Sequence, residues 1–249
     1  GSMTDKKTKK RDISKFDFDT GSAPARSSSQ EIAAFMEAAR RTAPVKGSGR
    51  LIFALDATMS RQPTWDLACE LQAEMFKVAG GVDGLSVQLV YFRGFGECKA
   101  SRWSRDGNDL ATLMQKIDCR GGRTQIGKVL KHALRESGKE KVSAVVYIGD
   151  AMEENIDLLC ERAGELGLRK VPCFVFHEGR DAIAEGGFRE IARLSGGAYA
   201  RFDRSAASEL AALLRAVATY ASGGRKALEQ SGGSAAKLLL SQLPGQGDR

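Results

Sequence analysis

Five oxygen-bearing side chains follow short apolar or glycine-rich segments at three separate places in the sequence: Asp56, Thr58, Ser60, Thr124 and Asp150. Two carboxylates and three hydroxyls make an all-oxygen ligand set, which suits a small divalent cation. The carboxylates offset the charge of the ion, while the neutral hydroxyls leave coordination positions for water or for an incoming ligand. The residue types therefore predict a Mg²⁺ site, with Mn²⁺ and Ca²⁺ as alternatives.

The segments around these residues follow the pattern of an α/β domain. Continuous apolar runs indicate parallel strands that are buried on both faces, at residues 51–55, 85–92, 142–148, 171–176 and 198–202. Apolar residues at helical spacing alternate with them, at residues 63–79, 108–117, 125–135, 153–165, 183–194 and 206–220. A turn with Gly94 and Gly96 after the second run suggests an antiparallel edge hairpin. We expect a doubly wound, mostly parallel central sheet with one antiparallel edge strand and helices on both faces, a Rossmann-like α/β fold.

This fold explains how residues far apart in the sequence can share one site. Asp56 ends the first expected strand, and Asp150 ends a later one. Thr124 begins a helix directly after Gly121 and Gly122, whose backbone freedom lets that loop approach the same place. In an open parallel sheet, the loops at the carboxyl ends of the strands converge where the strand order reverses. We therefore expect the three segments to meet in that crevice.

Each ligand candidate also has a purely structural explanation. The carboxylate of Asp56 would hold a turn, and the hydroxyls of Ser60 and Thr124 would cap helices. Asp150 would then be an ordinary loop carboxylate. These roles and metal binding can coexist.

Charged residues near the three segments would form the rim of such a site. Four arginines either select acidic partners there or are solvated loop cations: Arg61, Arg93, Arg120 and Arg123. Glu153 and Glu154 follow Asp150 and would deepen the negative field near the ion. Acidic residues in the first turn of a helix are ordinarily explained by the helix dipole. We favour that interpretation over a place for Glu153 in the rim.

The three segments together resemble the metal-ion-dependent adhesion site (MIDAS) of the von Willebrand factor A (VWA) domain. The family pattern of Asp-x-Ser/Thr-x-Ser, Thr and Asp is similar to Asp56-Ala-Thr-Met-Ser60, the Gly-Gly-Arg-Thr-Gln-Ile-Gly run at residues 121–127, and Asp150. The resemblance covers residues 50–222 in element order as well as motif. It implies that Asp56, Ser60 and Thr124 are close ligands, that Thr58 takes the first hydroxyl position, and that Asp150 acts through water. Two departures are Thr58, where Ser is commoner, and Arg123, which separates the glycine pair from Thr124 and adds a rim cation.

A metal-dependent protein-interaction module is the function that these features favour. A carboxylate from another protein would fill the open coordination position and make the ion a bridge between the two proteins. The VWA resemblance implies an intracellular adaptor, and relatives of this kind work in assemblies that contain AAA+ ATPases or chaperone-like partners. We therefore expect a protein partner that supplies Asp or Glu.

RNA binding and catalysis are the alternatives. The net charge of +7 invites an RNA-binding or ribonucleoprotein interpretation, but residues 50–222 carry 24 Lys or Arg against 23 Asp or Glu. The excess lies in the tails, which would have to bind the nucleic acid. A metal-dependent phosphatase ranks third, since Thr58 stands where an Asp-based phosphotransferase has its second Asp. Neither His132 nor His177 joins an evident catalytic arrangement, so we expect no enzyme.

The two ends of the chain differ from its middle. Residues 1–29 are basic and polar, which indicates a disordered tail, and residues 30–49 suggest a short amphipathic helix and a linker. The VWA-like domain follows at residues 50–222. At residues 223–249 the apolar segment is too short to be stable alone as a helix, so we favour a flexible tail over a segment that packs back on the domain or binds a partner.

Cysteine usage and hydropathy favour a cytoplasmic protein. The five cysteines show no Cys-x-x-Cys spacing and mostly fall in apolar segments, as reduced thiols do. No apolar run approaches the length of about 18 residues that a membrane-spanning helix requires. We expect no membrane partner.

Overall fold

The structure, a computed structural model, describes residues 49–58, 63–70, 85–203 and 207–245. Within them a six-stranded sheet has the order β3-β2-β1-β4-β5-β6. The strands are β1 (Arg50–Asp56), β2 (Ser86–Arg93), β3 (Glu97–Ala100), β4 (Ala144–Gly149), β5 (Cys173–Glu178) and β6 (Ala198–Phe202). Neighbouring strands are parallel except in the β2–β3 hairpin at one edge. The expected sheet, mostly parallel with one antiparallel edge strand, is confirmed.

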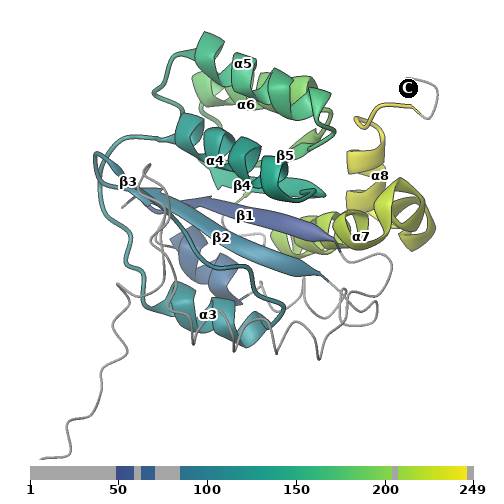
Figure 1. The fold of residues 1–249 in the computed structure, drawn as a ribbon, viewed down its shortest axis with the longest axis horizontal. Helices are drawn as coiled ribbons and strands as arrows, with labels where there is room; N and C mark the ends of the chain where they lie inside the picture. The colour runs from purple at the N-terminus through teal and green to yellow at the C-terminus, as the bar shows by residue number, and fades with distance from the viewer. Residues whose placement is uncertain (1–48, 59–62, 71–84, 204–206, 246–249) are drawn as a thin grey trace, which may run out of the picture.

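Helices cover both faces of the sheet. They are α3 (Gly107–Gln115), α4 (Ile126–Lys139), α5 (Ile156–Leu168), α6 (Ala182–Ser195), α7 (Ala207–Ser231) and α8 (Ser234–Leu240), and residues 63–70 are also helical. Figure 1 shows α4, α5 and α6 over one face and α3 and α7 against the other. Ile52 and Ala54 of β1 pack in the layer of α4, whereas Leu51, Phe53 and Leu55 pack in the layer of α7. Burial on both faces explains why β1 is a continuous apolar run in the sequence.

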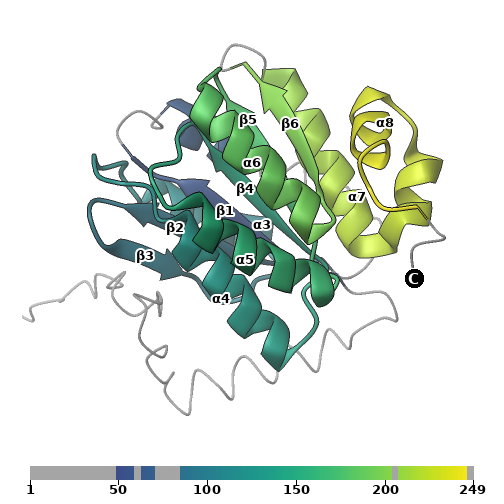
Figure 2. The same cartoon turned by 90° about the horizontal axis from the view of Figure 1, so that it is seen from above.

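The C-terminal segment packs against the domain, which differs from the flexible tail expected at residues 223–249. Helix α7 continues through a kink at Gly224, where φ is 74°, and α8 follows it. Leu228, Leu239 and Leu243 are buried in the same layer as α7. Figure 2 shows α8 beside α7. The short helix is stable here because its leucines leave water on contact with the domain, which an isolated segment cannot achieve.

A glutamine beyond α8 covers the edge of β6. The side-chain Nε2 of Gln242 donates to the carbonyl oxygen of Tyr199, and its Oε1 accepts from the Tyr199 amide, each at 2.7 Å. One side chain thus satisfies both backbone groups of Tyr199. An edge strand with satisfied backbone groups is a poorer template for pairing with another chain.

Several expectations concern residues that the structure does not describe. These are the tail at residues 1–29, the helix and linker at residues 30–48, and the side chains of Ser60 and Arg61. Within the described ranges, no helix combines the length and apolarity needed to cross a membrane.

Candidate metal centre

Asp56 lies where the strand order of the sheet reverses. Strands β2 and β3 extend the sheet on one side of β1, and β4, β5 and β6 extend it on the other. The carboxyl ends of β1 and β4 therefore border the crevice that the sequence predicted. Asp56 is only 2% exposed, and its Oδ1 accepts a hydrogen bond of 2.9 Å from the amide of Thr58. The end of β1 thus holds a carboxylate and a hydroxyl residue in one tight turn.

The loop before α4 is fixed against the end of β1 and against the β2–β3 hairpin. The amide of Arg120 donates to the carbonyl oxygen of Ala57 at 2.8 Å, and the amide of Arg123 donates to that of Gly94 at 3.0 Å. Gly122 lies so close to Gly94 that a Cβ atom at residue 122 would overlap the Gly94 carbonyl group. The absence of a side chain at Gly122 is therefore what permits the close approach.

Thr124 and the β4–α5 loop hold each other in place. The amide of Thr124 donates to Oε2 of Glu153 at 3.0 Å, and the amide of Glu153 donates to Oγ1 of Thr124 at 2.9 Å. Asp150 directly follows β4 in the same loop and is half-buried. The loops that carry Thr124 and Asp150 therefore meet through a reciprocal pair of hydrogen bonds.

Glu154, in the β4–α5 loop, forms hydrogen bonds with the start of α4. Its Oε2 accepts from the amide of Ile126 at 2.7 Å, and its Oε1 accepts from the amide of Gly127 at 2.8 Å. These amides are in the first turn of α4, where backbone donors lack partners within the helix. Gln125, at the N-cap position of α4, makes no capping bond with its side chain. Glu154 therefore caps α4 from across the site.

This arrangement corrects the interpretation that Glu153 and Glu154 serve the dipole of their own helix. Helix α5 begins at Ile156, because the side chain of Asn155 accepts hydrogen bonds from the amides of Asp157 and Leu158 at 2.9 and 3.4 Å. Both glutamates consequently remain in the loop, where Glu153 faces Thr124 and Glu154 faces the first turn of α4. Asn is among the residues preferred at the N-cap, so Asn155 was the signal in the sequence that could have placed this boundary.

The described donors fit a hard divalent cation. Hydrogen bonds join the segments that carry Asp56, Thr58, Thr124 and Asp150, and all four side chains offer oxygen. The hydroxyl oxygen of Thr124 accepts from Glu153 and has a second lone pair for an ion. The described part of the chain has no cluster of three or more His, Cys, Asp or Glu side chains that could hold a metal. A metal site there would therefore need the hydroxyls as well as the carboxylates.

The arginines expected at the rim differ in whether their side chains are paired within the protein or exposed. Arg93 forms hydrogen-bonded ion pairs with Glu97 at 2.8 and 3.1 Å, and its Nη1 donates to the carbonyl oxygen of Asp118. These contacts tie Arg93 to the hairpin and to the loop after α3. Arg120 and Arg123 have exposed side chains on the loop before Thr124. Of the predicted rim arginines that the structure describes, only Arg120 and Arg123 have side chains exposed for contact with a partner.

Both histidines have packing partners. His177, in β5, is fully buried with its Nδ1 2.7 Å from the hydroxyl of Tyr199 and its ring against the edge of Phe188. His132, in α4, is buried with its Nε2 2.8 Å from Oε1 of Gln88. These contacts agree with structural roles for both residues.

The two histidines should make the stability of the protein depend on pH. Burial lowers the pKa of His177 and the pKa of His132, in the latter case against the opposing effect of Glu136. Below the ordinary value of 6.5, the unfolded chain takes up a proton at each histidine that the native state does not bind, so stability falls with pH. We expect a loss of up to about 1 kcal/mol per histidine between about pH 6.5 and 5.5, measured by urea denaturation.

Histidine variants provide the control for this expectation. Each of His132→Gln and His177→Asn should make the free energy of unfolding less dependent on pH in this range than it is in the wild type. An unchanged pH dependence in both variants would show that other groups cause it.

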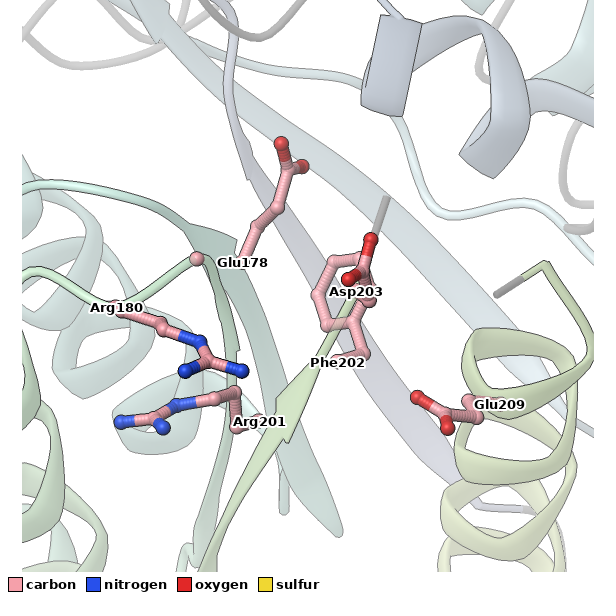
Figure 3. A pocket seen from close by; sticks show the side chains of 7 residues that line it. Glu178, Arg180, Arg201, Phe202, Asp203 and Glu209 are labelled. Atoms are coloured by element: carbon pink, nitrogen blue, oxygen red, sulfur yellow. The ribbon is translucent and has the colours of Figure 1, made fainter. Parts of the chain in front are cut away.

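A separate cavity of about 400 Å³ lies at the carboxyl ends of β5 and β6. Its lining carries both signs of charge, from Glu178, Arg180, Arg201, Asp203 and Glu209. Figure 3 shows the two arginines on one side of the view and Glu209, which projects from α7, on the other. Among the ligand candidates that the structure describes, which are Asp56, Thr58, Thr124 and Asp150, none lines this cavity. It is therefore distinct from the candidate metal centre.

Comparisons with known proteins identify the fold. No protein-family model and no curated protein matches the sequence. The VWA domain of SpRpn10 matches with a TM-score of 0.54 and 12% identity, over 66% of this chain and 95% of that one. Proximal thread matrix protein 1 from the mussel byssus, with a zinc-occupied MIDAS motif, matches with a TM-score of 0.56 and 19% identity, over 69% of this chain and 48% of that one. At these identities the likeness shows the fold alone, and this chain has the α/β fold of VWA domains.

Proposed function

We propose that this chain is a protein-interaction module that binds an acidic residue of a partner through a divalent cation, with Mg²⁺ as the expected ion. The observation that carries the proposal is the hydrogen-bonded meeting of three ligand-bearing segments where the strand order reverses. The residues that would hold the ion are Asp56, Thr58, Ser60, Thr124 and Asp150. When bound, the cation would supply an open position that attracts a carboxylate oxygen.

Two further findings support this proposal. The mussel byssus protein, which shares the fold, has a metal ion in its MIDAS motif. The Asp-x-Thr-x-Ser pattern that begins at Asp56 occurs here at the end of β1, in the structural context that its interpretation requires. We propose a cytoplasmic adaptor for an assembly with AAA+ ATPases or chaperone-like proteins as the setting, which the resemblance to intracellular VWA proteins implies.

Metal titration tests the site directly. Calorimetric titration with Mn²⁺ or Mg²⁺ should detect binding to the wild type, and Asp56→Ala should weaken it by at least about tenfold, since even the loss of outer contacts to a metal site has effects of that size. Asp157→Ala is the control, because Asp157 is an exposed carboxylate in the first turn of α5. Equal metal affinity in all three proteins would contradict the proposal.

Capture of partners tests the function of the ion. Proteins retained by the wild type in Mg²⁺ should be lost in EDTA and with Asp56→Ala, and they should be kept with Asp157→Ala. Recovery of the same proteins under all four conditions would show that binding does not pass through the metal.

A further inference from the structure

The tip of the β2–β3 hairpin exposes an aromatic ring beside the candidate metal centre. Phe95 lies between Gly94 and Gly96 and is 83% exposed. A single exposed apolar side chain is common on protein surfaces and by itself indicates nothing. The setting of this one differs, because the backbone before the ring contacts the loop that leads to Thr124 and the backbone after it contacts α4.

Several hydrogen bonds hold the hairpin tip in place. The amide of Gly94 donates to the carbonyl oxygen of Arg120 at 3.4 Å, in addition to the bond that Gly94 accepts from Arg123. The Nε2 of Gln125 donates to the carbonyl oxygens of Arg93 and Glu97, each at 3.3 Å, and Lys128 of α4 donates to that of Gly96 at 3.1 Å. The position of the Phe95 backbone is thus tied to the loop that carries Thr124 and to helix α4.

The surface around Phe95 has more positive than negative charge. Arg120, Arg123 and Lys128 are exposed and come from the segments that contact the hairpin. The carboxylate of Glu97, which also belongs to the hairpin, is paired with Arg93 and with Lys99. An acidic partner would therefore meet complementary charge on its way to the metal.

We propose that Phe95 and the cations around it are a second contact for the same partner, which would be an acidic peptide segment with an apolar side chain close to its metal-binding Asp or Glu. This inference rests on the proposed function, because the partner would bind the metal with its Asp or Glu and contact the hairpin tip with its apolar side chain. A nucleic acid fits less well, because its many phosphates require an extended basic surface, whereas residues 50–222 carry 24 Lys or Arg against 23 Asp or Glu.

Short synthetic peptides test the second contact with the full chain. One set has a central Asp in a Gly/Ser background, and the other has the same Asp with a Leu placed at each neighbouring position in turn. In Mg²⁺ the wild type should bind the best Leu peptide about tenfold more tightly than the Leu-free peptide, as expected when a phenylalanine ring becomes buried on binding. Phe95→Ser should lose this preference and Phe95→Leu should keep most of it.

A second exposed apolar residue serves as the matched control. Leu168, at the end of α5, is 87% exposed, so Leu168→Ser removes a comparable surface group and should leave the preference intact. If Phe95→Ser keeps the Leu preference while binding still requires Mg²⁺ and Asp56, the hairpin inference is wrong and the metal proposal stands. If peptides bind equally in EDTA and to Asp56→Ala, or do not bind at all, both are wrong. Tighter binding of oligouridine than of any peptide, lost in Phe95→Ser, would assign the surface to RNA instead.

Discussion

A Gly122→Ala protein should lose the attachment between the β2–β3 hairpin and the loop that precedes Thr124. The added methyl group would overlap the carbonyl group of Gly94, and a backbone group cannot rotate aside as a long side chain can. Either the hairpin or the loop must therefore move. We expect the free energy of unfolding to fall by about 1–3 kcal/mol, the usual cost of forcing an extra carbon into a packed position.

Hydrogen exchange locates the effect of this substitution. The amides of Gly94 and Arg123 donate the hydrogen bonds that join the hairpin to the loop, and both should exchange faster in Gly122→Ala. Gly96→Ala is the matched control in the same hairpin, because a Cβ atom there meets nothing within 4 Å. Protection of both amides in Gly122→Ala at the level of the control would contradict this account of the close approach.

The same substitution connects the hairpin with the metal centre. Gly122 precedes Thr124 by two residues, in the loop whose Arg120 and Arg123 amides contact Ala57 and Gly94. A displaced loop would move the Thr124 hydroxyl away from the end of β1. Gly122→Ala should therefore also bind Mn²⁺ more weakly than Gly96→Ala does, even though neither residue offers a side-chain ligand.

The fold was predictable because it depends on patterns that are local in the sequence. A strand buried on both faces, such as β1, needs a continuous apolar run, and a helix that covers the sheet needs apolar residues at helical spacing. Where the expectation differed, contacts between distant segments decided the structure. Leu239 and Leu243 belong to a segment too short to be a stable helix alone, and they are buried only because α7 and β6 provide a surface.

The sequence predicted where the segments of the candidate site lie in the sheet, but it did not predict the hydrogen-bond partners of the side chains around them. Asp56 and Asp150 follow strands, and strand order places such residues at one edge of the sheet. The roles of Arg93, Glu153 and Glu154 depend on which group faces each side chain across a loop. Arg93 pairs with Glu97 across the hairpin, Glu153 bonds with Thr124, and Glu154 bonds with the first turn of α4. The spacing of residues along the sequence does not predict these pairings.

Glu154→Ala should destabilise the protein strongly, because it removes both acceptors from the start of α4. The carboxylate accepts two short hydrogen bonds from backbone amides and places negative charge at the positive end of the helix dipole. Hydrogen bonds to charged groups contribute about 1.5–3 kcal/mol each, and the two share one side chain, so we expect a total loss of about 2–4 kcal/mol. Glu154→Gln keeps one acceptor oxygen and should fall between the alanine variant and the wild type.

Urea denaturation in Mg²⁺ and in EDTA separates capping by Glu154 from any effect of the ion. Because the capping bonds join Glu154 to protein amides, the loss of stability should be the same with and without metal. Glu161→Ala, which removes an exposed carboxylate from α5, should change the free energy of unfolding by less than about 0.5 kcal/mol. A loss that appears only in Mg²⁺ would instead mean that Glu154 stabilises the protein through the cation. The first turn of α4 would then depend on the bound cation for its stability, and Glu154 alone would not be enough to hold it.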